Sequence, residues 1–339
     1  MEHILKAPCL RRGDTVGVVS PSWGGAALFP HRVEAALRQL QDMGLRVKMA
    51  PHALGNQGYI AASPQQRAAD INAMFADTEV RAVLCTIGGD HSNQVLRYID
   101  FDVVRRNPKV WMGFSDITVL NIALWQETGL VTFNGPCLLT DFAEYPRMLD
   151  YTTEYFSRTV MTNKALGRIS PAPEWTEEFL DWGKRLDLTR PRKKIASGAW
   201  HWLKPGRARG RLMGGCIESL HHLRGTRFWP SWKDRILFIE TSEEKPTPAR
   251  IDSWLTDFEN MGVLAQLRGI LVGRAMRYSN EEKRQLRAIL VERTQDYHYP
   301  IVTDLDFGHT APQFVLPIGI EAHIDTYEES LTLVEAAVT

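Results

Sequence analysis

Apolar runs alternate with amphipathic segments along the first 135 residues, and this alternation constrains the fold more than any other feature of the sequence. Runs such as Thr15–Ser20 and Ala82–Ile87 are mostly apolar and lack the polar alternation of a strand with one face in solvent. Between them, Val33, Leu37 and Leu40 recur at helical spacing. Strands buried on both faces and joined by helices predict a doubly wound parallel sheet, and therefore an α/β fold.

The remaining N-terminal elements follow the same pattern. We expect a helix that begins at Ser63-Pro64, a second over Asp116–Glu127, and further strands at Leu45–Met49, Val110–Phe114 and Leu130–Phe133. Sites in such sheets lie outside the carboxyl ends of the strands. Those ends fall here at residues 20–23, 88–92, 115–116 and 134–136.

The composition and periodicity of the sequence change near residue 165. The 339 residues suggest two domains. Residues 166–205 are rich in Pro, Trp and basic side chains with weak periodicity, which predicts a linker and a long loop. Apolar strands and an amphipathic helix return from Arg235 onward, and alternating strands close the chain. We therefore predict an N-terminal α/β domain over 1–165 and a C-terminal mixed α/β domain over 206–339.

Composition and spacing argue against several classes of protein. Lys+Arg and Asp+Glu both number 40, so the chain lacks the positive excess typical of a nucleic-acid binder. No stretch approaches the ~18 apolar residues of a membrane helix, and no secretory signal opens the sequence. The four cysteines are far apart, and no H-E-x-x-H spacing occurs. We expect a cytoplasmic protein with reduced thiols and without a metal, a cofactor, a nucleic-acid partner or a membrane partner.

The segment Gly113-Phe-Ser115-Asp116-Ile117 is a strand-to-helix junction with serine at the turn. It is similar to a nucleophile elbow, in which a sharp turn exposes Oγ, but Ile117 stands where the G-x-S-x-G pattern has glycine. Capping of the helix by Ser115 or Asp116 explains the same residues, and spacing alone favours the cap.

The sequence Gly88-Gly89-Asp90 follows a buried strand. Paired glycines let the backbone approach a ligand and leave amides free to bind an anion. A plain tight turn explains them equally well, because neither phosphate-loop pattern is present.

A serine nucleophile needs a base and a group that orients the base. His309 follows a short strand, within Asp306-Phe-Gly-His-Thr-Ala-Pro. Glu240 directly follows the apolar run Ile236–Ile239, where a charge needs a partner. Glu243 and Glu244 lie in the next loop, where we expect them to be solvated. Convergent triads use several chain orders, including serine, acid, histidine.

Two further groups of side chains allow both a structural and a functional interpretation. Trp175 and Trp182 either hold the long loop to the body or stack on a ligand. Arg207, Arg209 and Arg211 could bind an anion, but a solvated basic loop is the better explanation.

Taken together, these motifs resemble the serine LD-carboxypeptidase family, which includes murein carboxypeptidases and microcin C immunity peptidases. The resemblance runs along almost the whole chain, and several motifs in the same order make it specific. They include Gly13-Asp-Thr, Ser20-Pro-Ser, Ile87-Gly-Gly, Gly113-Phe-Ser-Asp-Ile-Thr, Leu212-Met-Gly-Gly, Leu237-Phe-Ile-Glu-Thr-Ser, Gly269-Ile-Leu-Val-Gly-Arg and Phe307-Gly-His-Thr.

The resemblance implies a role for each candidate residue. Ser115 is the expected nucleophile, His309 the general base, and Glu240 the residue that orients His309. Backbone N–H groups of Gly89, Asp90 and Asp116 form the expected oxyanion hole. The family design implies an active site in the cleft between the two domains, and a homodimer.

Two departures from the family pattern bear on the substrate. Asp90-His91 stands where many family carboxypeptidases have Tyr-Gly. The loop that carries Trp175 and Trp182 resembles the microcin-immunity branch, in which aromatic residues stack on the nucleotide of an aminoacyl-nucleotide substrate. Gly88, Trp175 and Trp182 are the substrate-binding residues that we predict.

The sequence thus predicts a serine peptidase or amidase that acts through an acyl-enzyme on a small peptide-like substrate. The substrate is either a peptidyl- or aminoacyl-nucleotide of the microcin C type, or a murein tetrapeptide that loses its terminal D-Ala. The alternative is a non-catalytic nucleotide- or sugar-binding module, since fold does not fix function.

Overall fold

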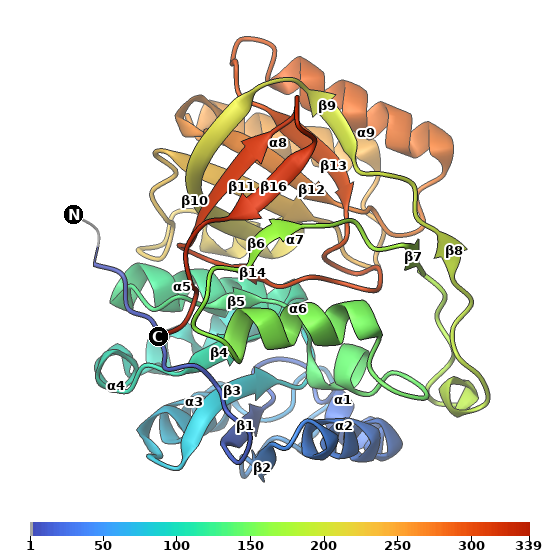
Figure 1. Cartoon of the computed structure of the whole chain (residues 1–339). Coiled ribbons are helices and arrows are strands. Elements are labelled where there is room, and N and C mark those ends of the chain that lie inside the picture. The colour runs from blue at the N-terminus through green and yellow to red at the C-terminus, as the bar shows by residue number, and fades with distance from the viewer. Residues whose placement is uncertain (1–2) are drawn as a thin grey trace.

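The computed structural model describes residues 3–339 and consists of two lobes, each built on one β-sheet (Figure 1). The sheet of the N-terminal lobe has six strands. In spatial order they are β14 (Leu316–Pro317), β5 (Phe133–Asn134), β4 (Val110–Met112), β3 (Val80–Cys85), β1 (Thr15–Val19) and β2 (Arg46–Met49). All neighbours pair in parallel except β14 and β5, which are antiparallel. The predicted α/β class and parallel sheet are confirmed.

Helices cover both faces of this sheet because the strand order reverses direction at β1. Right-handed crossovers place the helix of the first β-α-β unit on one face and the later helices on the other. The first is α2 (Pro30–Asp42), and the later ones are α3 (Pro64–Ala76), α4 (Phe101–Arg106) and α5 (Thr118–Thr128), which pack side by side. Shorter or peripheral helices are α1 (Gly25–Leu28) and α6 (Asp150–Val160).

Local signals account for most of these boundaries. Ser63 caps α3 in a capping box with Gln66, as the Ser-Pro start predicts. Strand β2 lies at the sheet edge and is only partly buried. The strand predicted over 130–133 is shorter and shifted: β5 contains only Phe133 and Asn134, and Leu130 makes a single bridge to Leu5.

The C-terminal lobe has the predicted mixed α/β character and is built on an eight-stranded sheet. Its parallel centre is flanked by antiparallel strands at both edges. In spatial order the strands are β6 (Gly167–Ile169), β16 (Ser330–Leu333), β15 (Glu321–Asp325), β10 (Arg207–Cys216), β11 (Arg235–Glu240), β12 (Gly269–Gly273), β13 (Ile301–Leu305) and β9 (His201–Lys204). Helices α8 (Pro248–Asn260) and α9 (Asn280–Arg293) pack against each other, and α7 (Ile217–Leu220) follows β10.

The segment 166–205, predicted as linker and loop, supplies both edges of this sheet. Strand β6 pairs with β16 and β9 pairs with β13, while β7 (Glu174–Trp175) and β8 (Ile195–Ala196) pair only with each other. Edge strands this short are set by their partners rather than by their own periodicity, so the sequence pattern does not reveal them.

The arginines predicted to lie on a basic loop are instead on strand β10. Arg207, Arg209 and Arg211 are two residues apart, which places them on one face of the strand. They pair with Asp325, Glu321 and Glu335 at N···O distances of 2.7, 2.7 and 2.8 Å. Because each guanidinium already has a carboxylate partner, this row is a set of surface ion pairs.

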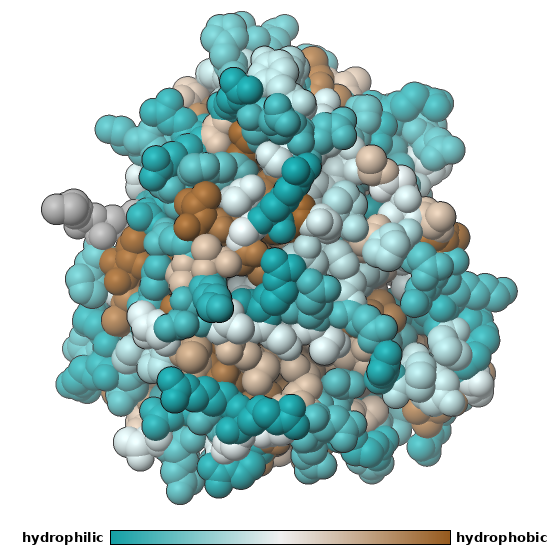
Figure 2. Space-filling view, in the orientation of Figure 1, coloured by the Kyte–Doolittle hydropathy of each residue, from teal (hydrophilic) through white to brown (hydrophobic). Residues whose placement is uncertain are grey.

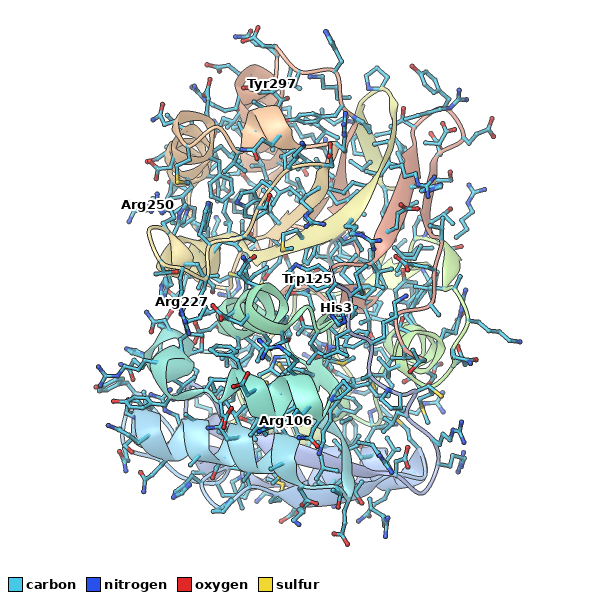
Figure 3. The ribbon with its side chains drawn as sticks, turned by 90° about the vertical axis from the view of Figure 1, so that its left-hand side faces the viewer. His3, Arg106, Trp125, Arg227, Arg250 and Tyr297 are labelled. Carbon is cyan, nitrogen blue, oxygen red and sulfur yellow. The ribbon has the colours of Figure 1, made fainter. Side chains whose placement is uncertain are left out.

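The chain crosses between the lobes more often than the division at residues 165 and 205 implies. Strand β14 comes from the C-terminal part of the chain but completes the N-terminal sheet beside β5. Helix α5 lies at the boundary between the lobes, where Trp125 is labelled (Figure 3). A Cβ on Gly319 would lie 2.0 Å from the Trp125 ring, so only glycine permits this contact.

Charged and polar side chains cover most of the face shown in Figure 2, with smaller hydrophobic patches between them. Within residues 3–339, every helix is too short or too polar to cross a lipid bilayer.

Candidate active site

Ser115 occupies the turn between β4 and α5, in a backbone conformation that serine rarely adopts. Its φ is +63°, in the left-handed region, and a short 3-10 turn over Ser115–Ile117 leads into α5. Neither Ser115 nor Asp116 caps a helix with its side chain here. The capping explanation is therefore not supported, and the strained turn matches the elbow-like alternative.

The three predicted catalytic side chains meet between the lobes. His309 Nε2 lies 3.0 Å from Ser115 Oγ, and His309 Nδ1 lies 2.6 Å from Glu240 Oε2. Ser115 follows β4 of one sheet, whereas Glu240 ends β11 and His309 follows β13 of the other. All three elements are parallel strands, so the carboxyl ends of both sheets supply the site.

Glu240 is a buried carboxylate with one strong partner. Its side chain is 0% exposed, and within residues 3–339 its Oε1 has no hydrogen-bond partner. Gly308 has a φ of +98°, and a Cβ there would lie 2.6 Å from Glu240 Oε2. Glycine thus allows the loop to close over the carboxylate, whose charge is balanced by the imidazole at Nδ1.

A second carboxylate, Glu243, also contacts His309. Its Oε2 lies 3.0 Å from His309 Nε2, and 57% of the side chain is exposed, in agreement with the predicted solvation. Burial opposes a positive charge on His309, but Glu240 and Glu243 outweigh it and hold the pKa of the imidazole well above its usual value. The hydrogen bond to His309 in turn lowers the pKa of Glu243 to about 2. No sequence signal marks Glu243, because only the fold of its loop brings it to the histidine.

The loop after β3 lies directly against the serine. Asp116 Oδ2 accepts hydrogen bonds from the amides of His91 and Ser92, at 2.9 and 2.8 Å, which fixes the loop. Within residues 3–339, no loop carbonyl and no side chain accepts a hydrogen bond from the backbone N–H groups of Gly89 and Asp116. Free amides beside a hydroxyl can bind the negative charge that develops on an attacked carbonyl. Asp90, whose backbone N–H is the third predicted donor, is exposed and does not line the adjoining cavity.

A cavity of about 410 Å³ opens beside Ser115 and His309. Trp182 is on its wall, with Arg32 Cζ 4.2 Å from the centroid of the indole ring. Trp175 is not on the wall, which corrects its predicted role in substrate binding. It is 7% exposed and packs beneath Arg274, 4.7 Å from its ring centroid, so it holds the loop to the body. Sequence alone did not separate the two tryptophans, because both lie in the same aperiodic segment.

Comparisons with known proteins agree with this architecture. The LD-carboxypeptidase N-terminal domain matches residues 16–135, and the LD-carboxypeptidase C-terminal domain matches residues 209–324. The chain is 33% identical to the probable murein peptide carboxypeptidase of Bacillus subtilis, over 98% of this chain and 95% of that protein. The chain belongs to the LD-carboxypeptidase family. LD-carboxypeptidases are peptidases, so the protein is a hydrolase.

The chain is also similar to a microcin immunity protein. It is 29% identical to the microcin C7 self-immunity protein MccF of Escherichia coli, over 98% of this chain and 96% of that protein. The solved structure of MccF in complex with aspartyl sulfamoyl adenosine matches with a TM-score of 0.90 and 26% identity, over 99% of this chain and 100% of that one.

The first prediction concerns the glycine loop beside Ser115. A Cβ on Gly88 would lie 2.9 Å from Ser115 Oγ and 3.1 Å from the amide N of Asp116. Gly88→Ala is therefore expected to lower kcat about 10²- to 10³-fold by crowding the anion-binding amides, with little change in melting temperature. Gly198→Ala is the matched control, because a Cβ there meets nothing within 4 Å. Full activity of Gly88→Ala would place the oxyanion elsewhere.

Proposed function

We propose that the protein is a serine-type carboxypeptidase that hydrolyses an amide in a small peptide-like substrate through a Ser-His-Glu triad. The observation that carries this proposal is the continuous contact from Ser115 Oγ through His309 to Glu240, at 3.0 and 2.6 Å. A nucleophile, a base and an orienting carboxylate in that order are the recurring arrangement of acyl-transfer enzymes.

In the proposed reaction, each step has one group of the site assigned to it. Neutral His309 accepts the Ser115 hydroxyl proton at Nε2 while Oγ forms a bond to the substrate carbonyl carbon. The amides of Gly89 and Asp116 donate to the resulting oxyanion. His309 then gives its proton to the leaving nitrogen, and the C–N bond breaks to leave an acyl-enzyme. Water, deprotonated by His309, attacks that ester and restores Ser115.

Two substrate classes are compatible with this chemistry, and the cavity favours one of them. An aminoacyl- or peptidyl-nucleotide of the microcin C type has a base that can stack on an aromatic ring, and Trp182 offers one on the cavity wall. The relative MccF binds aspartyl sulfamoyl adenosine. A murein tetrapeptide, cleaved to release its terminal D-Ala, is the second class, since a relative is named for murein peptides.

The deciding experiment is a mass-spectrometric cleavage screen. Purified protein is incubated with murein tetrapeptide and, separately, with aminoacyl sulfamoyl adenosine conjugates, and Ser115→Ala serves as the blank. We expect amide cleavage and a transient mass increase on Ser115. Ligand binding without turnover or an acyl-enzyme would instead favour a non-catalytic binding module.

The second prediction separates the two tryptophans. Trp182→Ala is expected to raise KM for a nucleotide conjugate about tenfold, the effect of losing one base-aromatic stack, with kcat nearly unchanged. Trp175→Ala is expected to leave KM unchanged and to lower the melting temperature, because that ring packs in the protein. Steady-state kinetics and thermal unfolding measure the two effects. An unchanged KM in Trp182→Ala would remove stacking from the proposal.

A further inference from the structure

Glu243 has a place in the site that the triad does not explain. It lies in the loop between β11 and α8, and its Oε2 is 3.0 Å from His309 Nε2. The same nitrogen is 3.0 Å from Ser115 Oγ. The Glu243 side chain is 57% exposed, whereas that of Glu240 is 0% exposed. The imidazole thus has a buried carboxylate on one nitrogen and an accessible carboxylate on the other.

This arrangement conflicts with the role of His309 as a base. A base accepts a proton at the Nε2 lone pair, and a carboxylate oxygen at 3.0 Å would repel that lone pair. The contact is favourable only when Nε2 carries a proton, so that both ring N–H groups donate to carboxylates. His309 is then an imidazolium, which cannot take the Ser115 proton. Arg277, exposed on the same cavity wall, also lowers the pKa of Glu243, but less than the hydrogen bond from His309 does.

We propose that Glu243 exchanges partners: it holds His309 in the protonated, inactive form while the cavity is empty, and it binds an ammonium group of the substrate when the cavity is filled. This inference rests on the proposed function. When Glu243 leaves, Nε2 releases its proton to water, and the neutral imidazole then accepts the proton of Ser115. Glu243 is therefore a positioning residue, which touches the base rather than the reacting bond.

The charges of the cavity wall favour an ammonium group as the second partner. Five carboxylates line the cavity, and four of them are held by the protein. Asp187 pairs with Arg32, Glu144 with Arg192 and Glu178 with Arg190, while Asp141 accepts from Gln313. In the part of the chain that the structure describes, the ion pair of Glu243 is with His309 alone. Glu243 is thus the wall carboxylate most available to a cation from outside.

Distance also places Glu243 correctly for this exchange. Glu243 Oε2 and Ser115 Oγ each lie 3.0 Å from the same atom, His309 Nε2. The distance between the two oxygens is therefore at most about 6 Å. A carbonyl positioned for attack lies about 3–3.5 Å from Oγ. A substituent on the next carbon of the substrate, where an amino acid has its amine, therefore falls within reach of Glu243.

The test uses a fluorophosphonate probe, which reacts with an activated serine whatever the natural substrate is. The labelling rate is measured against pH for the wild type, Glu243→Gln and the matched neighbour variant Glu244→Gln. Removing the charge of Glu243 is expected to move the midpoint of the rate downward by at least about one pH unit, and so to raise the rate near pH 6 about tenfold. Glu244→Gln is expected to follow the wild type.

The same assay tests the second partner by competition. Alanyl sulfamoyl adenosine and its N-acetyl derivative are compared as protectants against labelling. In the wild type, acetylation of the amine is expected to weaken protection at least tenfold, and in Glu243→Gln less than threefold.

The outcomes separate this inference from the proposed function. Three results would overturn the exchange: a pH profile of Glu243→Gln equal to that of the wild type, an equal loss of protection on acetylation in both proteins, or no protection by either compound. In each case, labelling of Ser115 would still support the triad. A wild type that is labelled at no pH overturns the triad and the exchange together.

Discussion

Ser115→Ala is expected to lower kcat/KM at least about 10⁴-fold, because removal of a triad nucleophile leaves only the binding and oxyanion contributions to catalysis. Oγ is the atom that we propose forms the acyl bond, and no other hydroxyl lies on the contact chain to His309 and Glu240 within residues 3–339. The measurement is the initial rate on whichever substrate the cleavage screen identifies, together with the mass of the protein during turnover.

The control for this variant is Ser197→Ala. The Ser197 hydroxyl makes no hydrogen bond within residues 3–339 and lies outside the site, so its loss should leave the rate unchanged. The alanine at 115 also removes no packing of consequence, and we expect both variants to melt near the wild type. Turnover by Ser115→Ala at the wild-type rate would refute the proposed mechanism.

Glu240→Gln is expected to lower kcat/KM about 10⁴-fold without unfolding the protein. The amide has nearly the same shape as the carboxylate, but it can donate its N–H to Nδ1. Donation at Nδ1 forces the ring proton onto Nε2, and Nε2 then cannot accept the proton of Ser115. Near-normal activity would instead show that Glu240 does not orient His309, since the other carboxylate on the ring, Glu243, contacts Nε2 rather than Nδ1.

Steady-state kinetics and thermal unfolding test the Glu240 prediction together. The Glu240 side chain is completely buried, so a misfolded variant would show a large drop in melting temperature rather than a selective loss of rate. Glu244→Gln provides the comparison, since it makes the same chemical change four residues away at an exposed position.

The sequence predicts the strands of the N-terminal lobe well because each is an apolar run bounded by turn residues. Burial on both faces leaves no polar alternation, and strands such as Val80–Cys85 are recognisable by composition alone. The edges of the second sheet are different. Strands β6 and β9 contain three and four residues of mixed character, and only their partners β16 and β13 make them strands.

The candidate site also has residues that the sequence predicts and one that it does not. Ser115 and Glu240 directly follow apolar runs predicted from the sequence, and His309 lies in the loop after a short strand, positions that mark them as candidates. The three side chains meet only because the two sheets face each other, and spacing along the chain does not encode that arrangement. The expectation that they meet came from the family resemblance. Glu243 had no such guide, because its contact with His309 comes from the path of one surface loop.

Strand β14 has a consequence for the alignment of the reacting groups. Serine hydroxyl and imidazole belong to opposite halves of the molecule, so any rocking of one half against the other would pull them apart. Strand β14 (Leu316–Pro317) lies only a few residues after His309 in the chain and is hydrogen-bonded to β5. Strand β5 in turn lies next to β4, the strand that precedes Ser115. The loop that carries His309 is therefore attached to the same sheet as Ser115. The backbone itself holds the Ser115 and His309 side chains next to each other, without a bound ligand.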